Sequence, residues 1–199
     1  PRVMFAATRS GSGKTTVTCG VLAALKKQNI KVQAYKCGPD YIDPMFHKTV
    51  IGTAAYNLDT YLMSNDAVNY LLNKNSGDIA VIEGVMGFYD GFSFTEKGST
   101  HELSEITDTD VILVVNCRRM SRSAMALVKG FKEFRKNNIK GVIFNNLSEK
   151  MYGNLAEKCR KIGLTPLGFL PNIKDVQISS RHLGLVTAGE IDDIKDKMN

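Results

Sequence analysis

The sequence predicts an α/β domain with a doubly wound, mostly parallel sheet and helices on both of its faces. Short β-rich apolar runs alternate along the chain with stretches of helical periodicity, which is the order of parallel strands joined by crossover helices. Several of these runs are apolar throughout, Val111–Val115 most clearly, rather than alternating between apolar and polar residues. Because a continuously apolar strand is covered on both faces, we expect helices on both sides of one sheet.

The strands are short runs of β-branched and other apolar residues. They are predicted at Val3–Ala7, Val32–Lys36, Ile79–Glu83, Val111–Asn116, Gly141–Asn145 and Leu167–Leu170. The stretch Lys36–Asp59 lacks clear periodicity and is long for a structureless connection. Long loops of that kind are usually functional or contain an element that the pattern does not reveal, and we expect one or the other here.

The helices are predicted from apolar periodicity and from capping residues at their ends. Thr15–Gln28 places Val17, Val21 and Leu25 on one face. Further helices are predicted at Ser64–Asn73, from the capping box Ser99–Glu102 onward, at Ser121–Arg135 and at Ser148–Ile162, where Gly163 follows as a C-cap.

Composition excludes several classes of protein. The chain has 199 residues, 43% hydrophobic and 23% charged, which suits one soluble globular domain. No apolar run approaches the roughly 20 residues that cross a bilayer, so no membrane partner is expected. The net charge of +6 suits an anionic ligand, but no long basic run indicates a nucleic-acid partner. The scattered cysteines and histidines argue against zinc and favour buried thiols in a reducing cytoplasm, where we expect the protein to reside.

The strongest motif is the segment Thr8–Thr15, with the sequence TRSGSGKT, between a predicted strand and a predicted helix. This is the setting of a phosphate-binding loop, although its first position holds Thr where Gly is usual. Gly11 and Gly13 would aim backbone N–H groups at a phosphate, Lys14 would reach the β- and γ-phosphates, and the Thr15 hydroxyl would ligate Mg²⁺. The residues expected to bind ATP here are Ser10, Gly11, Ser12, Gly13, Lys14, Thr15 and Thr16.

Two further segments carry polar residues at the carboxyl ends of predicted strands. Glu83 ends one strand, where a P-loop enzyme places a carboxylate beside Mg²⁺. Lys36, Asp40 and Asp43 follow another strand. Ligands of doubly wound folds bind beyond the carboxyl ends of the strands, so these side chains should face the same crevice as Lys14. The competing interpretation of the Asp and Pro residues is turn formation.

These segments resemble the ATP-binding domain of cobyrinic acid a,c-diamide synthases, which are related to dethiobiotin synthetases and to the deviant P-loop ATPases of the partition and septum-site type. The matching segments run in family order: Lys36–Pro44, Asn57–Asp59, Val81–Gly91, Gly98–Thr100, Met120–Ser123, Gly141–Asn145 and Arg181–Val186. The signature Lys of the switch ATPases is replaced by Arg9. The resemblance implies a dethiobiotin-synthetase-like P-loop fold.

The resemblance also implies an ATP-dependent ligase of cobalamin biosynthesis. ATP would phosphorylate the a- and c-acetate carboxylates of a tetrapyrrole polycarboxylate such as cobyrinate, and ammonia from glutamine would displace the phosphate. Residues 1–199 would form the synthetase domain, with a C-terminal glutamine amidotransferase domain expected in the full-length protein. The implied catalytic residues are Lys14, Lys36, Asp40, Asp43 and Asp90, and the implied magnesium ligands are Thr15, Asp40 and Glu83.

Other positions have two interpretations. Asn145 resembles the adenine-contacting Asn of dethiobiotin synthetase, or it is a turn residue at a strand end. Ser99 and Thr100 would present a helix N-terminus to a substrate carboxylate, or they form a plain cap. Arg122, like Arg118 and Arg119, would meet substrate carboxylates or lie on a solvated basic face. Tyr41, with Asp90, is expected to order the substrate or the ammonia step.

The alternative functions are a nickel-sirohydrochlorin a,c-diamide synthase, a dethiobiotin-synthetase-like carboxylate ligase and a partition-type switch ATPase. Distinctive residues in Lys36–Pro44 and Glu83–Gly91 favour an enzyme that binds a substrate over a switch. The sequence leaves open the metal of the macrocycle, ATP against CTP, and whether the chain forms a homodimer.

Overall fold

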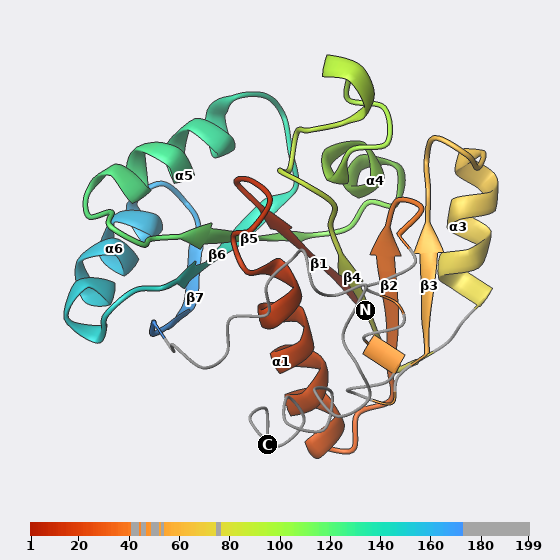
Figure 1. Ribbon diagram of the computed structural model, residues 1–199, viewed down its shortest axis with the longest axis horizontal. Coiled ribbons are helices and arrows are strands. Elements are labelled where there is room, and N and C mark those ends of the chain that lie inside the picture. Colours follow the sequence, from red (N-terminus) through yellow and green to blue (C-terminus); the bar gives the residue numbers. More distant parts are fainter. Residues whose placement is uncertain (41–43, 45–46, 49–51, 53, 75–76, 173–199) are drawn as a thin grey trace.

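The computed structural model of the protein describes residues 1–40, 44, 47–48, 52, 54–74 and 77–172. They form one seven-stranded sheet with the strand order β3-β2-β4-β1-β5-β6-β7, in which every neighbouring pair is parallel (Figure 1). The strands are β1 (Arg2–Ala7), β2 (Val32–Cys37), β3 (Ala55–Leu58), β4 (Ile79–Glu83), β5 (Val111–Asn116), β6 (Ile139–Asn145) and β7 (Thr165–Leu170). The predicted doubly wound parallel sheet is confirmed.

Helices cover both faces of this sheet. They are α1 (Lys14–Lys27), α3 (Asn65–Lys74), α4 (Thr100–Ile106), α5 (Ser123–Glu133) and α6 (Glu149–Lys161), with a short 3₁₀ helix, η2 (Phe92–Phe94). Leu22 of α1 packs in one core with Phe5 of β1, whereas Met4 of β1 lies in the other core, with α3, α4, α5 and α6. Successive residues of a strand point to opposite faces, so β1 contributes to both cores.

Three predicted helix ends are confirmed. The Ser64 side chain accepts a hydrogen bond from the Ala67 amide at 3.2 Å, and the Ser99 side chain caps α4 by accepting from the Glu102 amide. Gly163 follows α6 with φ 73°, a left-handed conformation that Gly adopts without strain. The predicted start of α5 at Ser121 is wrong by two residues, because the chain first makes a turn and the helix begins at Ser123.

Strand β3 is the element that the apolar pattern does not reveal. It has four residues, only Leu58 of them is buried, and it lies at the edge of the sheet beside β2. So short an edge strand leaves no apolar run to detect. Its presence confirms that the Lys36–Asp59 stretch contains a further element.

The four cysteines are buried free thiols, as predicted. Burial raises the pKa of Cys37 to about 12, which keeps this thiol protonated at neutral pH. Among the described residues, no helix has the length and apolar character needed to cross a membrane.

Because all strands are parallel, their carboxyl ends meet at one edge of the sheet. There β1 lies between β4 and β5, and Lys36 at the end of β2 is the register partner of Glu83 at the end of β4. The chain segments that follow β1, β2 and β4 therefore converge, as the sequence predicts.

Candidate nucleotide and metal site

The segment after β1 has the backbone of a phosphate-binding loop. Gly11 and Gly13 have φ values of 72° and 94°, in the left-handed region that Gly tolerates, and α1 begins directly after Gly13. A Cβ atom on Gly13 would lie 2.2 Å from Nδ2 of Asn145. Both the conformation and the close approach therefore require glycine at position 13.

Lys14 and Asn145 tie this loop to its neighbours. The Lys14 ammonium donates a hydrogen bond to the carbonyl oxygen of Met86, in the segment after β4. Nδ2 of Asn145, at the end of β6, donates to the carbonyl oxygen of Ser12 at 2.9 Å. Asn145 thus supports the loop from the end of β6, two strands away from β1 in the sheet, and its contact with an adenine ring stays a prediction.

Glu83 is the centre of a buried polar cluster. Its Oε1 atom accepts hydrogen bonds from the Thr15 hydroxyl at 2.6 Å and from the Lys36 ammonium at 3.2 Å. Its Oε2 atom lies 2.9 Å from Nε2 of His47. Glu83 and His47 have no exposed surface, and Lys36 is 3% exposed. We call Thr15, Lys36, His47 and Glu83 the Glu83 cluster.

The electrostatics of this cluster keep the Glu83 carboxyl ionised. Burial alone would raise its pKa, but the charge of Lys36, the hydrogen bond and charge of His47, and the Thr15 hydroxyl together lower the pKa to about 2. An ionised carboxylate can only accept hydrogen bonds. Nε2 of His47 is therefore the protonated ring nitrogen, and its N–H group donates a hydrogen bond to Oε2.

Lys36 lies between two carboxylates. Besides Glu83, its ammonium contacts Oδ2 of Asp40 at 3.8 Å and donates to the carbonyl oxygen of Gly84 at 3.1 Å. The Asp40 side chain is 31% exposed, so it faces the solvent side of the cluster. Nδ2 of Asn57 donates a hydrogen bond to the backbone carbonyl oxygen of Asp40 at 2.7 Å. The structure thus brings Lys36, Asp40 and Glu83 together, while Tyr41 and Asp43 lie outside the described residues.

The predicted residues after β4 form a turn and a helix cap. Oδ2 of Asp90 accepts a hydrogen bond from the Gly87 amide at 3.0 Å and so closes the turn that follows Met86. The Thr100 hydroxyl accepts from the Val85 amide at 2.9 Å, and it lies 3.0 Å from the Val85 carbonyl oxygen. These contacts hold the segment whose carbonyl group Lys14 binds. A catalytic role for Asp90 stays a prediction.

The residues predicted to meet substrate carboxylates differ in their exposure. Ser99 and Thr100 are fully buried, and their side chains are engaged in the hydrogen bonds of the α4 cap and of the segment after β4. Arg122 is exposed at the N-terminal end of α5, near the equally exposed Arg118 and Arg119. Contact of any of them with a substrate stays a prediction.

His47 is the site residue that the sequence analysis missed. A single histidine among scattered ones has no spacing that marks it, and its partner Glu83 lies 36 positions away. The available signal was its place inside Lys36–Asp59, the stretch expected to be functional.

The site suits the magnesium ion of a bound nucleotide. Mg²⁺ usually takes one or two protein oxygens and completes its shell with phosphates and water. The Thr15 hydroxyl and the ionised Glu83 carboxylate offer such oxygens beside the phosphate loop. Within the residues that the structure describes, no group of three or more His, Cys, Asp or Glu residues is arranged to hold a metal by itself, so the bound phosphates would have to supply further oxygens.

The fold and the loop geometry define the class of a P-loop nucleotide-binding domain. The family of CobQ/CobB/MinD/ParA nucleotide binding domains matches residues 3–186, and the chain belongs to this family.

Cobyrinate a,c-diamide synthases are similar to the chain over its whole length. The enzyme of Sulfolobus acidocaldarius is 43% identical over 100% of this chain, and that of Thermoplasma volcanium is 44% identical over 98%. The Priestia megaterium enzyme is 42% identical over 95%. The chain spans 46%, 44% and 42% of these proteins, respectively, which is less than half of their length. The family resemblance expected from the motifs is confirmed.

Solved structures share the fold at low sequence identity. Chloroplast FtsY of Physcomitrella patens has a TM-score of 0.61 at 14% identity, covering 83% of this chain and 56% of that one. A nucleotide-binding protein of Archaeoglobus fulgidus in complex with ADP has a TM-score of 0.56 at 11% identity, covering 99% and 86%. These likenesses support the P-loop fold.

Proposed function

We propose that the chain is the ATP-binding synthetase domain of a cobyrinate a,c-diamide synthase. The observation that carries this proposal is the Glu83 cluster, which lies beside a phosphate loop that ends in Gly13, Lys14 and Thr15. The similarity to cobyrinate a,c-diamide synthases over the whole chain supports the choice of substrate. The proposed reaction is the amidation of the a- and c-acetate carboxylates of cobyrinate.

The chemistry requires activation of a carboxylate. A carboxylate oxygen of the macrocycle attacks the γ-phosphorus of ATP, the bond to the β-phosphate oxygen breaks, and ADP leaves. Ammonia then attacks the acyl carbon, inorganic phosphate leaves with the original oxygen, and the nitrogen loses a proton. Such a transfer depends mainly on positioning and on neutralisation of phosphate charge.

This chain's residues would supply that positioning. The N–H groups of residues 10–16 and the Lys14 ammonium would hold the triphosphate, because they lie at the start of α1. Thr15 and Glu83, with Asp40 as a further ligand, would hold Mg²⁺, which neutralises phosphate charge when bound. Lys36 would offset charge at the transferring phosphoryl group or anchor a substrate carboxylate, since it lies between Glu83 and Asp40.

Several parts of the proposal concern the longer protein. Relatives more than twice as long as this chain leave room for a glutamine amidotransferase domain that supplies ammonia. The roles of Tyr41, Asp43 and Asp90, a homodimer and a cytoplasmic location stay predictions.

The test is an amidation assay with ATP, Mg²⁺ and an ammonium salt, using cobyrinate and nickel sirohydrochlorin as separate substrates. We expect mass spectrometry to detect the mono- and diamide of cobyrinate, with one ADP formed for each amide. Amidation of nickel sirohydrochlorin but not of cobyrinate would identify the protein as a nickel-sirohydrochlorin a,c-diamide synthase. ATP turnover that no tetrapyrrole polycarboxylate changes, with nucleotide-dependent dimerisation, would favour the switch ATPase instead. The same assay with CTP in place of ATP shows which of the two nucleotides the protein uses.

A further inference from the structure

The fully buried His47 contacts the carboxylate that the proposed magnesium site uses. Its Nε2 atom lies 2.9 Å from Oε2 of Glu83, while Oε1 of Glu83 accepts from Thr15 and Lys36. Within the described part of the chain, the hydrogen bond to Oε2 comes from His47. Oε1 thus has two donors and Oε2 has one, and together these donors fix the plane of the carboxylate.

Removal of the imidazole would leave Oε2 in a buried place without this donor. Neither side chain has exposed surface, so the space left by the imidazole is not open to bulk solvent. A buried carboxylate that loses a donor turns toward the donors that remain, which here are the Lys36 ammonium and the Thr15 hydroxyl. That rotation would change the direction in which Oε1 faces the phosphate loop.

We propose that His47 is a positioning residue that holds the Glu83 carboxylate for the magnesium ion of the bound nucleotide. His47 lies in the connection between β2 and β3, which also carries Asp40, so its bond ties that segment to the end of β4. Donors behind a ligating group orient it, and their loss typically lowers metal affinity by about 10–100-fold. The proposal rests on the nucleotide site of the proposed function, but not on which carboxylate is amidated.

The test compares the full chain with His47→Ala and His47→Gln by titrating Mg²⁺ into each protein with a fluorescent ATP analogue. For His47→Ala we expect the Mg²⁺ concentration at half-saturation to rise by about 10–100-fold. Nucleotide affinity in EDTA should stay at the wild-type value, because the phosphate loop is intact. The Gln amide can donate to Oε2, so His47→Gln should recover most of the Mg²⁺ affinity.

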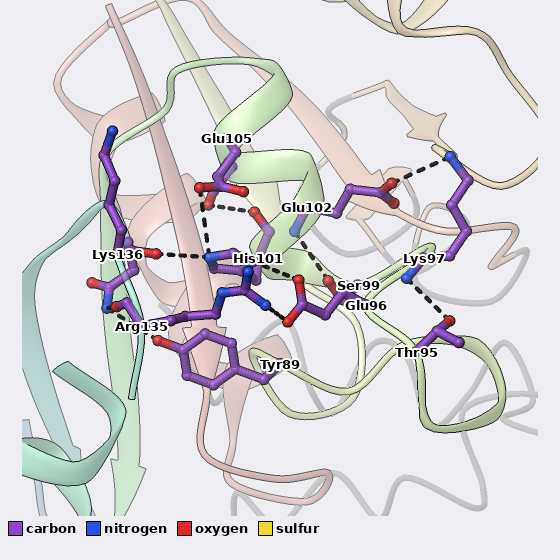
Figure 2. A network of polar contacts seen from close by, with 12 residues as sticks. Tyr89, Thr95, Glu96, Lys97, Ser99, His101, Glu102, Glu105, Arg135 and Lys136 are labelled. Carbon is purple, nitrogen blue, oxygen red and sulfur yellow. Dashed lines mark hydrogen bonds and ion pairs between the residues drawn. The ribbon is translucent and has the colours of Figure 1, made fainter. Parts of the chain in front are cut away.

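His101 provides the matched control. It is also fully buried, and one ring nitrogen, Nε2, contacts the carbonyl oxygen of Lys136 at 3.0 Å. Figure 2 shows it among Tyr89, Glu96, Glu105, Arg135 and Lys136, all of which lie outside the phosphate loop. His101→Ala removes a similar buried ring, so it should lower the unfolding temperature and leave the Mg²⁺ titration unchanged.

The outcomes separate the two proposals. A wild-type Mg²⁺ titration in His47→Ala, or an equal shift in His101→Ala, would overturn the role of His47. If His47→Ala does not fold, His47→Met takes its place, because Met fills the same space without a donor. Weakened Mg²⁺ binding with an unchanged affinity in EDTA then supports the role, and a wild-type titration or weakening of both overturns it. Wild-type protein that binds Mg-nucleotide but amidates no tetrapyrrole would contradict the proposed function alone.

Discussion

Two buried histidines lie in regions of opposite character. His47 belongs to the Glu83 cluster, where it contacts a fully buried carboxylate at 2.9 Å. His101 belongs to what we call the α4–α5 flank, the surroundings of His101, Glu96, Glu105 and Lys136 (Figure 2). There it contacts a backbone carbonyl group, and the carboxylates of Glu96 and Glu105 lie 3.9 Å away, with 40% and 48% of their side chains exposed.

The difference lies in what each histidine contacts, because both rings are equally buried. A buried ionised carboxylate needs every one of its donors, since water cannot stabilise it. Exposed carboxylates near His101 are hydrated and screened, so their ion pairs contribute little. The rings of Phe88 and Tyr89, with centroids 5.4 and 5.1 Å away, hold His101 as part of the packed core. The Glu83 cluster therefore holds a buried charge, whereas the flank holds its histidine by packing.

The largest expected effect comes from Lys14. Lys14→Ala removes the ammonium that would bind the β- and γ-phosphates, and ATP turnover should fall by at least about 100-fold. The matched variant outside the Glu83 cluster is Lys132→Ala, since Lys132 of α5 also donates to a carbonyl oxygen, that of Ile139 at 3.0 Å. Steady-state ADP release should be unchanged in that variant. Full turnover in Lys14→Ala would contradict the phosphate-loop assignment.

The next effect is a pH dependence of stability at Glu83. Its pKa is lowered from 4.5 to about 2 in the folded protein, so its ionised form stabilises the fold. This contribution is complete above pH 4.5 and is lost as the pH falls through about 2. Glu83→Gln should therefore unfold more easily than wild type by about 3 kcal/mol at pH 7, and the gap should close toward pH 2.

Urea unfolding at a series of pH values measures that gap. Glu105→Gln is the control in the flank, because the contact of this partly exposed carboxylate with His101 should contribute less than about 1 kcal/mol. A gap for Glu83→Gln that stays constant from pH 7 to pH 2 would show that Glu83 stabilises the fold by contacts other than its charge.

The smallest effects distinguish two glycines. Gly13→Ala places a residue with φ 94° under strain and a Cβ atom against Asn145, so it should destabilise the protein by about 1–2 kcal/mol and weaken nucleotide binding. Gly130 in α5 has no atom within 4 Å of an added Cβ. Gly130→Ala should stabilise by about 0.5–1 kcal/mol. The unfolding temperature should therefore fall in Gly13→Ala and rise in Gly130→Ala. Shifts of the same sign in both variants would contradict this account of the loop.

The sequence predicts only some residues of the site around Glu83. Some of these residues belong to local motifs, whereas others come together only through the path of the chain in space. The phosphate loop is a local motif, so residues 8–15 alone predict its place before α1. Lys36 and Glu83 are predicted to converge because both end parallel strands, and their register in β2 and β4 agrees. The contact of His47 with Glu83 depends on the path of the β2–β3 connection, which no periodicity describes. The four-residue β3 is missed because so short and exposed an edge strand carries no apolar run.

The most direct measurement of the central claim follows the oxygen of the substrate. Cobyrinate with ¹⁸O in its acetate carboxylates is incubated with the protein, MgATP and ammonium, and the inorganic phosphate is examined by mass spectrometry. If the carboxylate attacks ATP at this site, one ¹⁸O atom should appear in phosphate for each amide formed, and Lys14→Ala should form neither product. Phosphate free of ¹⁸O while amides accumulate would contradict activation of the carboxylate by ATP.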